Sequence, residues 1–304
     1  MSGEQDVKRK NHQVTRGYLA NWSCKDDKNT KCIWYINIEK QKVLCSQGEA
    51  AGFAVSDWLY VPKLISGNRD PVLENWFAGY ERDLCKLARI SRYGRPKMRM
   101  SATSEENAIK GCINLGFRSK YSLDGIASHY RTQRPELSEE QTVLAALQTL
   151  HNASVSFFEI FRKTVFTVAY NLPVKLVLDE DPFHISRLES GKILGVQMAL
   201  SPTSLMFGLP DTKYINEDRL FKGFKINWLD GAGFPDLSNK YNRTSINGAR
   251  QWLVCSSKEQ AQNILPDLST EKVAKRALKD RVFNLPLMLS GVYRTLYEAD
   301  LPQY

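Results

Sequence analysis

The residues best suited to chemistry in this chain of 304 residues stand near its start, in residues 11–18. His12 is one of only four histidines, and an imidazole with an ordinary pKa of about 6.5 can give or take a proton near neutral pH. Tyr18 adds a phenol able to orient a phosphate or a carbonyl group. In an extended segment, the even separation of His12 and Tyr18 places both on one face. The pattern indicates an acid–base site. The alternative is that His12 fixes the entry of the chain by a hydrogen bond while Tyr18, Leu19 and Trp22 anchor the segment to the core.

A second candidate is the basic segment 86–134. It contains eleven Lys and Arg but only three acidic residues, a local charge of +8 within a net charge of +9. Cationic side chains there surround an aromatic ring, as in surfaces that hold phosphates and stack bases. The residues are Arg89, Arg92, Tyr93, Arg95, Lys97 and Arg99. We expect DNA or RNA as the partner of this segment, and the alternative is a solvated face.

Two further groups of side chains are expected to be structural. The acidic residues 179–181, with His184 three residues later, superficially resemble a hard-metal site, but Pro182 favours an exposed turn whose carboxylates pair with Lys or Arg. The six cysteines are scattered without a Cys-x-x-Cys pair, so buried or idle thiols are expected. Glycine-rich phosphate loops, nucleophile elbows, zinc His-Glu-x-x-His motifs and kinase motifs are missing from the sequence. We therefore expect no metal and no cofactor.

Composition places the chain among globular proteins. Hydrophobic residues make up 42% and aromatic residues 11% of the sequence, enough to bury a sizeable core. No apolar run approaches the roughly 18 to 20 residues needed to cross a bilayer, and the polar start lacks the apolar centre of a secretion signal. We expect a cytoplasmic protein with no membrane partner.

Strands and then helices are predicted in the first half of the chain. Two apolar runs, 32–38 and 43–45, flank four polar residues and predict a β-hairpin. Residues 53–61 indicate a further short extended piece. Apolar residues then recur at spacings of three and four over 73–88, which predicts a helix. Glu81 lies at the margin of its apolar stripe, where a carboxylate can point into a groove or pair with a nearby Arg.

Two more helices are expected before the middle of the chain. Ser104, followed by two glutamates, is predicted to open a short helix toward Phe117. Ser138 and Gln141 form a capping-box pattern, which predicts a long helix that continues to Val165. This region therefore separates the N-terminal hairpin from the strands that follow.

The second half has the pattern of strands closed by helices. Its apolar runs are short and separated by Gly, Pro, Asp and Asn, which is typical of strands. They cover residues 172–178, 193–200, 205–209, 224–228 and 252–255. Ser257 and Ser269 then stand where helix caps are expected.

The order of these regions, β-α-β-α, predicts an α+β architecture. We expect residues 1–304 to form a single α+β domain. Two lobes are the alternative, with the hairpin and helices in 1–166 and the strands and C-terminal helices in 167–304.

The segment around His12 resembles the opening His-His-x-Val-Pro-x-x-Tyr-Leu of the microbial HHxxP family, domain of unknown function 4238. That family continues with a Trp-containing hairpin, matched by residues 33–36, and with a helix bearing Glu, matched by Glu74 or Glu81. No reaction comes with the family, so the resemblance points to a site rather than to an activity.

The second half of the family's pattern is also matched in order. A Thr-Ser-Asp-Asn-Pro-Val loop corresponds to residues 169–174, a Pro-Leu-Ser-Pro strand end to residues 199–202, and a lone Asn to Asn247. The resemblance thus implies one convergent site, formed by His12, Tyr18, Glu81, Asn171, Ser201 and Asn247.

This chain departs from the family pattern at three places. The first histidine is Asn11, the proline is Thr15, and the Ser-Asp of the second motif is replaced by Tyr170 and Asn171. If the family's chemistry needs those residues, the chain is a diverged or inactive member.

Two kinds of function follow from these observations. The first is an enzyme acting on nucleic acid or a nucleotide, with His12 as general acid or base, Glu81 as its partner, and residues 89–99 holding phosphate. Phosphodiester cleavage is its most economical reaction, nucleotide transfer is a variant, and a phage-defence role follows from the patchy character of the family. The second is a non-enzymatic nucleic-acid-binding protein or partner subunit in which His12 is structural.

Overall fold

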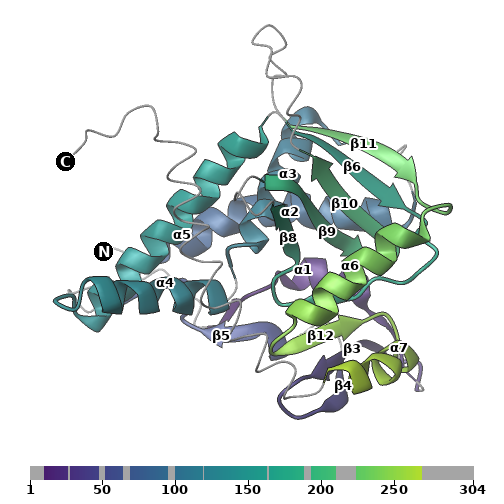
Figure 1. Ribbon diagram of the computed structural model, residues 1–304, viewed down its shortest axis with the longest axis horizontal. Coiled ribbons are helices and arrows are strands. Elements are labelled where there is room, and N and C mark those ends of the chain that lie inside the picture. Colours follow the sequence, from purple (N-terminus) through teal and green to yellow (C-terminus); the bar gives the residue numbers. More distant parts are fainter. Residues whose placement is uncertain are drawn as a thin grey trace, which may run out of the picture.

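Figure 1 shows the computed structural model of the chain. It describes residues 10–26, 28–47, 52–63, 69–94, 100–118, 120–162, 164–187, 193–209 and 224–268. Short strands come first, a block of helices follows, and strands return before the last described helices. This order confirms the predicted α+β class, and the N-terminal hairpin is present.

Helices fill the middle of the chain and the end of its described part. The α-helices are α1 (Arg16–Leu19), α2 (Val72–Arg92), α3 (Ala102–Leu115), α4 (Lys120–Gln133), α5 (Glu139–Phe161), α6 (Pro235–Gly248) and α7 (Lys258–Ile264). Shorter 3-10 turns are η1 (Ala20–Trp22), η2 (Gly52–Ala54) and η3 (Leu265–Asp267). Local hydrogen bonds mark where α2 and α5 begin, although the N-cap position of α2 itself is Pro71. The Asp70 carboxylate accepts from the Val72 amide at 2.9 Å, and Ser138 forms the predicted capping box with Gln141.

Several predicted helix boundaries were wrong. Ser101, not Ser104, caps α3, because the Ser101 hydroxyl accepts from the Ser104 amide. Val165 belongs to a strand rather than to α5, because it pairs with strands on both sides. Helix α6 stands where only strands were predicted, since its buried face carries Ser238, Tyr241 and Ser245 and so lacks an apolar stripe. Ser257 does cap α7, whereas Ser269 lies outside the described residues.

The larger sheet has the strand order β11-β6-β10-β9-β8. Its strands are β6 (Val165–Tyr170), β8 (Phe183–Arg187), β9 (Ile193–Ser201), β10 (Ser204–Leu209) and β11 (Lys225–Asp230). All neighbours are antiparallel except β11 and β6, which run parallel. The predicted strand at residues 172–178 is mostly irregular, because the Leu172 and Leu176 amides bond to the turn between β9 and β10.

The second sheet joins the two ends of the described chain. Its order is β2-β3-β12-β7, with β4 paired to β3. The strands are β2 (Cys24–Lys25), β3 (Lys31–Asn37), β4 (Lys42–Gln47), β7 (Leu178–Asp179) and β12 (Trp252–Cys255). A separate pair is formed by β1 (Lys10–His12) and β5 (Val55–Asp57). Because β12 lies between β3 and β7, strands from residues 1–166 and 167–304 share one sheet.

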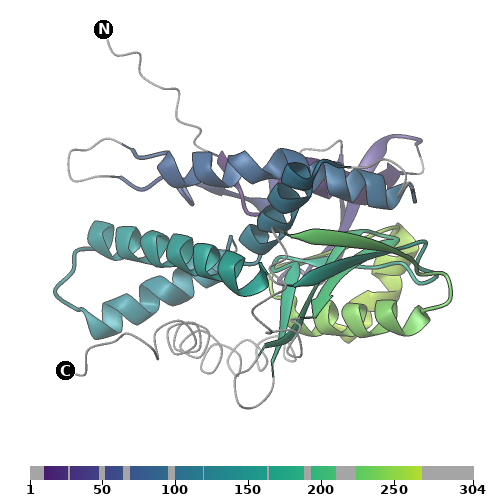
Figure 2. The ribbon, with the colours of Figure 1, turned by 90° about the horizontal axis from the view of Figure 1, so that it is seen from above.

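The larger sheet lies between helices. Helix α2 packs on β9 and β6, and α3 contacts β11 and β8. Figure 2 shows α2 and α6 on opposite sides of this sheet. The α2 side chains that enter the core are Phe77, Leu84, Leu87 and Ala88, so the predicted apolar stripe is the buried face.

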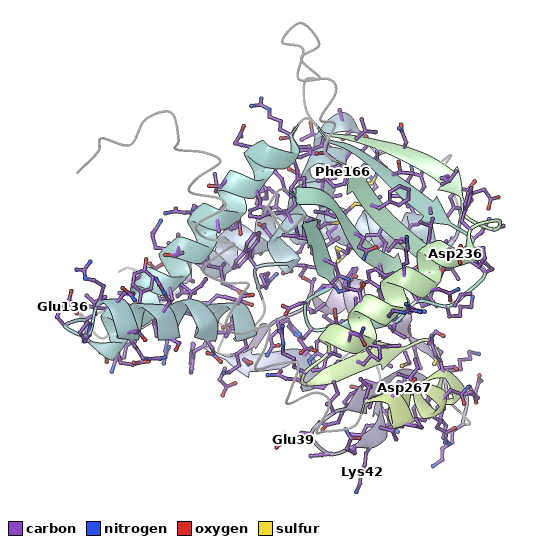
Figure 3. All side chains as sticks on the ribbon, viewed as in Figure 1. Glu39, Lys42, Glu136, Phe166, Asp236 and Asp267 are labelled. Atoms are coloured by element: carbon purple, nitrogen blue, oxygen red, sulfur yellow. The ribbon has the colours of Figure 1, made fainter. Side chains whose placement is uncertain are left out.

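Helices α4 and α5 form a hairpin that extends away from both sheets, with Glu136 at its far end (Figure 3). The β3–β4 turn, labelled by Glu39 and Lys42, lies at the lower edge of the same view. Within the described ranges, no helix is both long enough and apolar enough to cross a membrane.

Candidate functional site

The candidate site is organised by Arg118, which follows α3 and is only 1% exposed. Its Nη1 donates to Glu81 Oε1 in a close ion pair, and its Nη2 lies 3.8 Å from Glu74 Oε2. Nη2 also donates to the His12 backbone carbonyl at 3.0 Å. One buried guanidinium therefore joins β1, α2 and the end of α3.

Aromatic rings and a hydroxyl complete the surroundings of Arg118. The guanidinium carbon lies 4.7 Å from the Phe77 ring centroid and 5.2 Å from that of Tyr60. The Tyr60 hydroxyl donates to the Arg118 backbone carbonyl, and burial raises the pKa of this phenol above its usual range. A charge in such a setting is stable only when it is paired, and two carboxylates fulfil this role.

His12 interacts electrostatically with Glu81 in this cluster. Burial acts to raise the pKa of the Glu81 carboxyl, but Arg118, the Thr15 hydroxyl and His12 outweigh it and lower that pKa. The Glu81 side chain remains 27% exposed, and His12 is half-buried. The arrangement thus offers an ionised carboxylate next to an imidazole at a position that solvent reaches, which is suited to proton transfer.

Tyr18 is not on that exposed surface. It is fully buried, and its hydroxyl donates to the Ala199 carbonyl of β9. Burial raises the pKa of Tyr18 well above its usual value. The phenol therefore ties α1 to the larger sheet.

Ser201 and Asn171 lie near the C-terminal end of α2. The buried Ser201 hydroxyl is 2.6 Å from that of Ser204, which in turn is 2.8 Å from that of Ser91. Asn171 has a positive φ of 56°, and its Oδ1 is 3.0 Å from the position that a Cβ on Gly94 would occupy. Ser91 follows Glu81 by ten residues, about 15 Å along a helix. These residues therefore form a group separate from His12 and Glu81.

Asn247 occupies a third place. It is exposed on the last turn of α6, and that helix lies on the opposite side of the larger sheet from α2 (Figure 2). The six residues implied by the resemblance therefore do not form one site, and only His12 and Glu81 are both partly exposed and electrostatically coupled.

The residues of the basic segment also separate. Arg89 and Tyr93 are exposed, whereas Arg92 is half-buried and donates to the Ala20 and Ser23 carbonyls at 3.3 and 3.1 Å. Arg95, Lys97 and Arg99 lie outside the described residues.

Much of the charge of this segment is compensated by nearby carboxylates. Of the eight basic residues of this segment that the structure describes, five form ion pairs. The pairs are Lys110–Glu106, Arg118–Glu81, Lys120–Asp124, Arg131–Glu139 and Arg134–Glu136. Within segment 86–134, the described cations without a carboxylate partner are therefore those in the C-terminal half of α2.

The acidic residues 179–181 are structural partners of three different groups. Asp179 Oδ2 is 3.1 Å from His184 Nε2, and Asp181 accepts from Arg250 at 2.9 Å. Glu180 Oε1 accepts from the Arg250 and Gln251 backbone amides at 2.7 and 3.1 Å. The predicted pairing with Arg is confirmed for Asp181.

The expectation that this turn is exposed was wrong. Asp179 is 2% exposed and Glu180 is 3% exposed, because the turn crosses from β7 in one sheet to β8 in the other. The ring of His184 also stacks on Tyr241 of α6 at a centroid distance of 4.8 Å. Over the part of the chain described, no three His, Cys, Asp or Glu side chains are placed to hold a metal ion.

The chain matches no protein-family model, and neither a curated protein nor a solved structure gives a match. The resemblance to the HHxxP family stays a prediction. The site therefore has to be interpreted from its own geometry.

Sequence reasoning missed Arg118, which holds the site together. It was one of eleven basic residues in its segment, and nothing in its neighbours distinguished a buried Arg from a solvated one. The one available signal was Glu81 at the margin of an apolar stripe, which requires a nearby cation if the carboxylate is to be buried.

Proposed function

We propose that this chain is an enzyme that acts on nucleic acid or a nucleotide, with His12 and Glu81 as its proton-transfer pair. The observation that supports this proposal is the electrostatic interaction of the half-buried His12 with the ionised, partly exposed Glu81 carboxylate, where Arg118 pairs with that carboxylate and donates to the His12 backbone carbonyl. Rigid placement of an acid–base pair is what general acid–base catalysis requires.

In this proposal His12 is the general acid or base, and Glu81 orients the imidazole and stabilises its charged form. Arg118 does not touch substrate, because it is buried behind the two carboxylates. The substrate phosphate is held instead by Arg89, an exposed residue that follows Glu81 by eight positions, about 12 Å along α2. Phosphodiester cleavage is the reaction that best uses these groups.

The test compares cleavage of labelled single-stranded RNA and DNA by the full chain and by His12→Ala and Glu81→Gln. Loss of the acid–base pair is expected to lower kcat by about 10² to 10⁴-fold. His129→Ala is the matched control, because this histidine is exposed on α4 and should leave the rate unchanged. Thermal melting of each variant separates loss of activity from loss of folding. Full activity in His12→Ala, or no cleavage by the unaltered chain, would contradict the proposal.

A second candidate is nucleic-acid binding without catalysis. It is supported by the exposure of Lys86, Arg89 and Tyr93 on or next to the last turns of α2, where cations and an aromatic ring lie in one region of the surface. Under this alternative, His12→Ala binds RNA and DNA normally, whereas Arg89→Ala and Tyr93→Ala weaken binding.

A further inference from the structure

Three of the six cysteines meet on neighbouring strands of the second sheet. Cys24 of β2 lies directly opposite Cys32 of β3. Cys32 in turn lies opposite Gln47 of β4, and Cys45 is two residues from Gln47. Opposite residues, and residues two apart in a strand, share one face of a sheet. All three thiols therefore lie on one face, although their spacing in the sequence predicted idle, scattered cysteines.

The thiols also differ in access. Cys32 is buried, whereas Cys24 and Cys45 are half-buried at its two sides. Burial raises the pKa of Cys32, and its thiol interacts with those of both Cys45 and Cys24. The same face continues at Trp34, whose ring lies 5.5 Å from the ammonium of Lys258 in α7. A small reagent can therefore reach the outer thiols, while Cys32 is reached through them.

We propose that Cys24 and Cys32 form a thiol–disulfide site, which a small disulfide oxidises to a Cys24–Cys32 bridge. Directly opposite residues of antiparallel strands have Cα atoms about 4.5 to 5.5 Å apart, within the range of disulfides. Cys45 stands diagonally to Cys32, at a typical Cα distance of about 7 to 8 Å, which a disulfide does not span without movement of the backbone.

The reaction proceeds in two exchange steps. The thiolate of the half-buried Cys24 attacks one sulfur of the small disulfide, forms a mixed disulfide and releases one small thiol. The thiolate of Cys32, after its proton passes to solvent, attacks the Cys24 sulfur and releases the second small thiol. Two protein thiols are oxidised, and one small disulfide is reduced to two thiols. Because burial raises the pKa of both cysteines, the reaction is expected to be faster at higher pH.

The bridge would restrain residues 16–25, the segment between the candidate site and β3. Strand β2 follows η1 and α1 directly, and Arg92 of α2 holds the Ser23 carbonyl at 3.1 Å. A disulfide would tie the end of this segment to β3. The chemistry of the thiols does not depend on the function proposed for His12 and Glu81.

The test treats the full chain with oxidised glutathione, alkylates the remaining thiols and digests with trypsin. Lysines and an arginine place each cysteine in its own peptide, residues 17–25, 32–40 and 43–63. The expected product is the linked pair 17–25 and 32–40, with Cys45 alkylated, and the link disappears on reduction.

Variants make the assignment specific. Cys45→Ser should still form the bridge and show a higher Tm after oxidation, because a cross-link restricts the unfolded chain. Cys24→Ser and Cys32→Ser should show neither the linked peptide nor the rise in Tm. A link between Cys32 and Cys45, a product that stops at glutathione adducts, or no oxidation at all would overturn the proposal.

Discussion

Arg118 is the residue on which the candidate site depends. Its charge is buried with those of Glu81 and Glu74, so the three groups are stable only together. We expect Arg118→Ala to lower the free energy of unfolding by about 3 to 5 kcal/mol, because it leaves carboxylates in a partly buried position without their cation. Chemical denaturation followed by circular dichroism measures this change.

Arg131→Ala is the control for that prediction. Arg131 also pairs with a carboxylate, Glu139, but both side chains are at least half exposed. Exposed ion pairs contribute about 0 to 1 kcal/mol. Equal effects of the two substitutions would show that burial of Arg118 is not what makes it important.

Glu180 leads to a prediction about pH. Burial raises its pKa to about 8, with Asp179 and Asp181 adding to the effect. The folded chain therefore keeps a proton on Glu180 over a range in which the unfolded chain has lost it. The contribution of Glu180 to stability should fall as pH rises from about 4.5 to 8, by at most about 1.4 kcal/mol per pH unit, and level off above that.

Glu180→Gln is the matched variant for this test. It keeps an oxygen that accepts from the Arg250 and Gln251 amides, and Glu180 Oε2 has no hydrogen-bond partner among the described residues. The difference in unfolding free energy between the variant and the original chain should grow from pH 5 to pH 8. A difference that does not change over this range would mean that Glu180 is ionised in the folded protein.

Among the elements, α1 depends on a close approach to α2. A Cβ on Gly17 would lie 2.8 Å from Cys85 Sγ. We expect Gly17→Ala to destabilise the chain by about 1 to 3 kcal/mol through this overlap. In a Cys85→Ala background the overlap is gone, and the same change should be neutral or stabilising by up to about 1 kcal/mol, since Ala favours a helix. Thermal melting of the original chain, the two single variants and the double variant gives the coupling free energy between Gly17→Ala and Cys85→Ala. Additive effects of the two substitutions on stability would contradict the close contact between these residues.

The elements that were predicted correctly have local signals. The capping box at Ser138 and the apolar stripe of α2 each depend on residues close together in the sequence. Strand β6 and helix α6 were missed because distant partners decide them. Val165 pairs with Leu209 and Lys225 in the larger sheet. Helix α6 buries Tyr241, whose hydroxyl donates to the Pro182 carbonyl.

The same reasoning explains how much of the site was predictable. His12 and Glu81 were identified by residue type and position, and in the structure the two side chains interact electrostatically. Ser201 and Asn171 were grouped with them through short motifs. In the structure Ser201 is linked through Ser204 to Ser91, which lies about 15 Å along α2 from Glu81, and a short motif does not encode such a distance. The thiol group depends on the registers of β2, β3 and β4, and no spacing in the sequence reveals a register.

At the scale of the whole molecule, only part of the net charge of +9 can bind an anionic partner, because many basic side chains are already paired. Five basic residues of the segment 86–134 already have carboxylate partners. Lys86 and Arg89 are exposed, and Arg95, Lys97 and Arg99 lie outside the described residues. Arg92 is half-buried and donates to two backbone carbonyls, so at most about five cations of this segment, three of them outside the described residues, can meet a nucleic acid.

This estimate predicts the salt dependence of binding to single-stranded DNA. Each phosphate contact contributes about −0.7 to the slope of log affinity against log salt, so two to five contacts give a slope of about −1.4 to −3.5. Arg89→Ala should reduce its magnitude by about 0.7, whereas Arg131→Ala, an ion-paired residue at the end of the α4–α5 hairpin, should not change it. Fluorescence anisotropy over a salt series measures both slopes. Binding that does not respond to salt would exclude phosphate contact, and an Arg131 effect equal to that of Arg89 would move the binding surface to the hairpin.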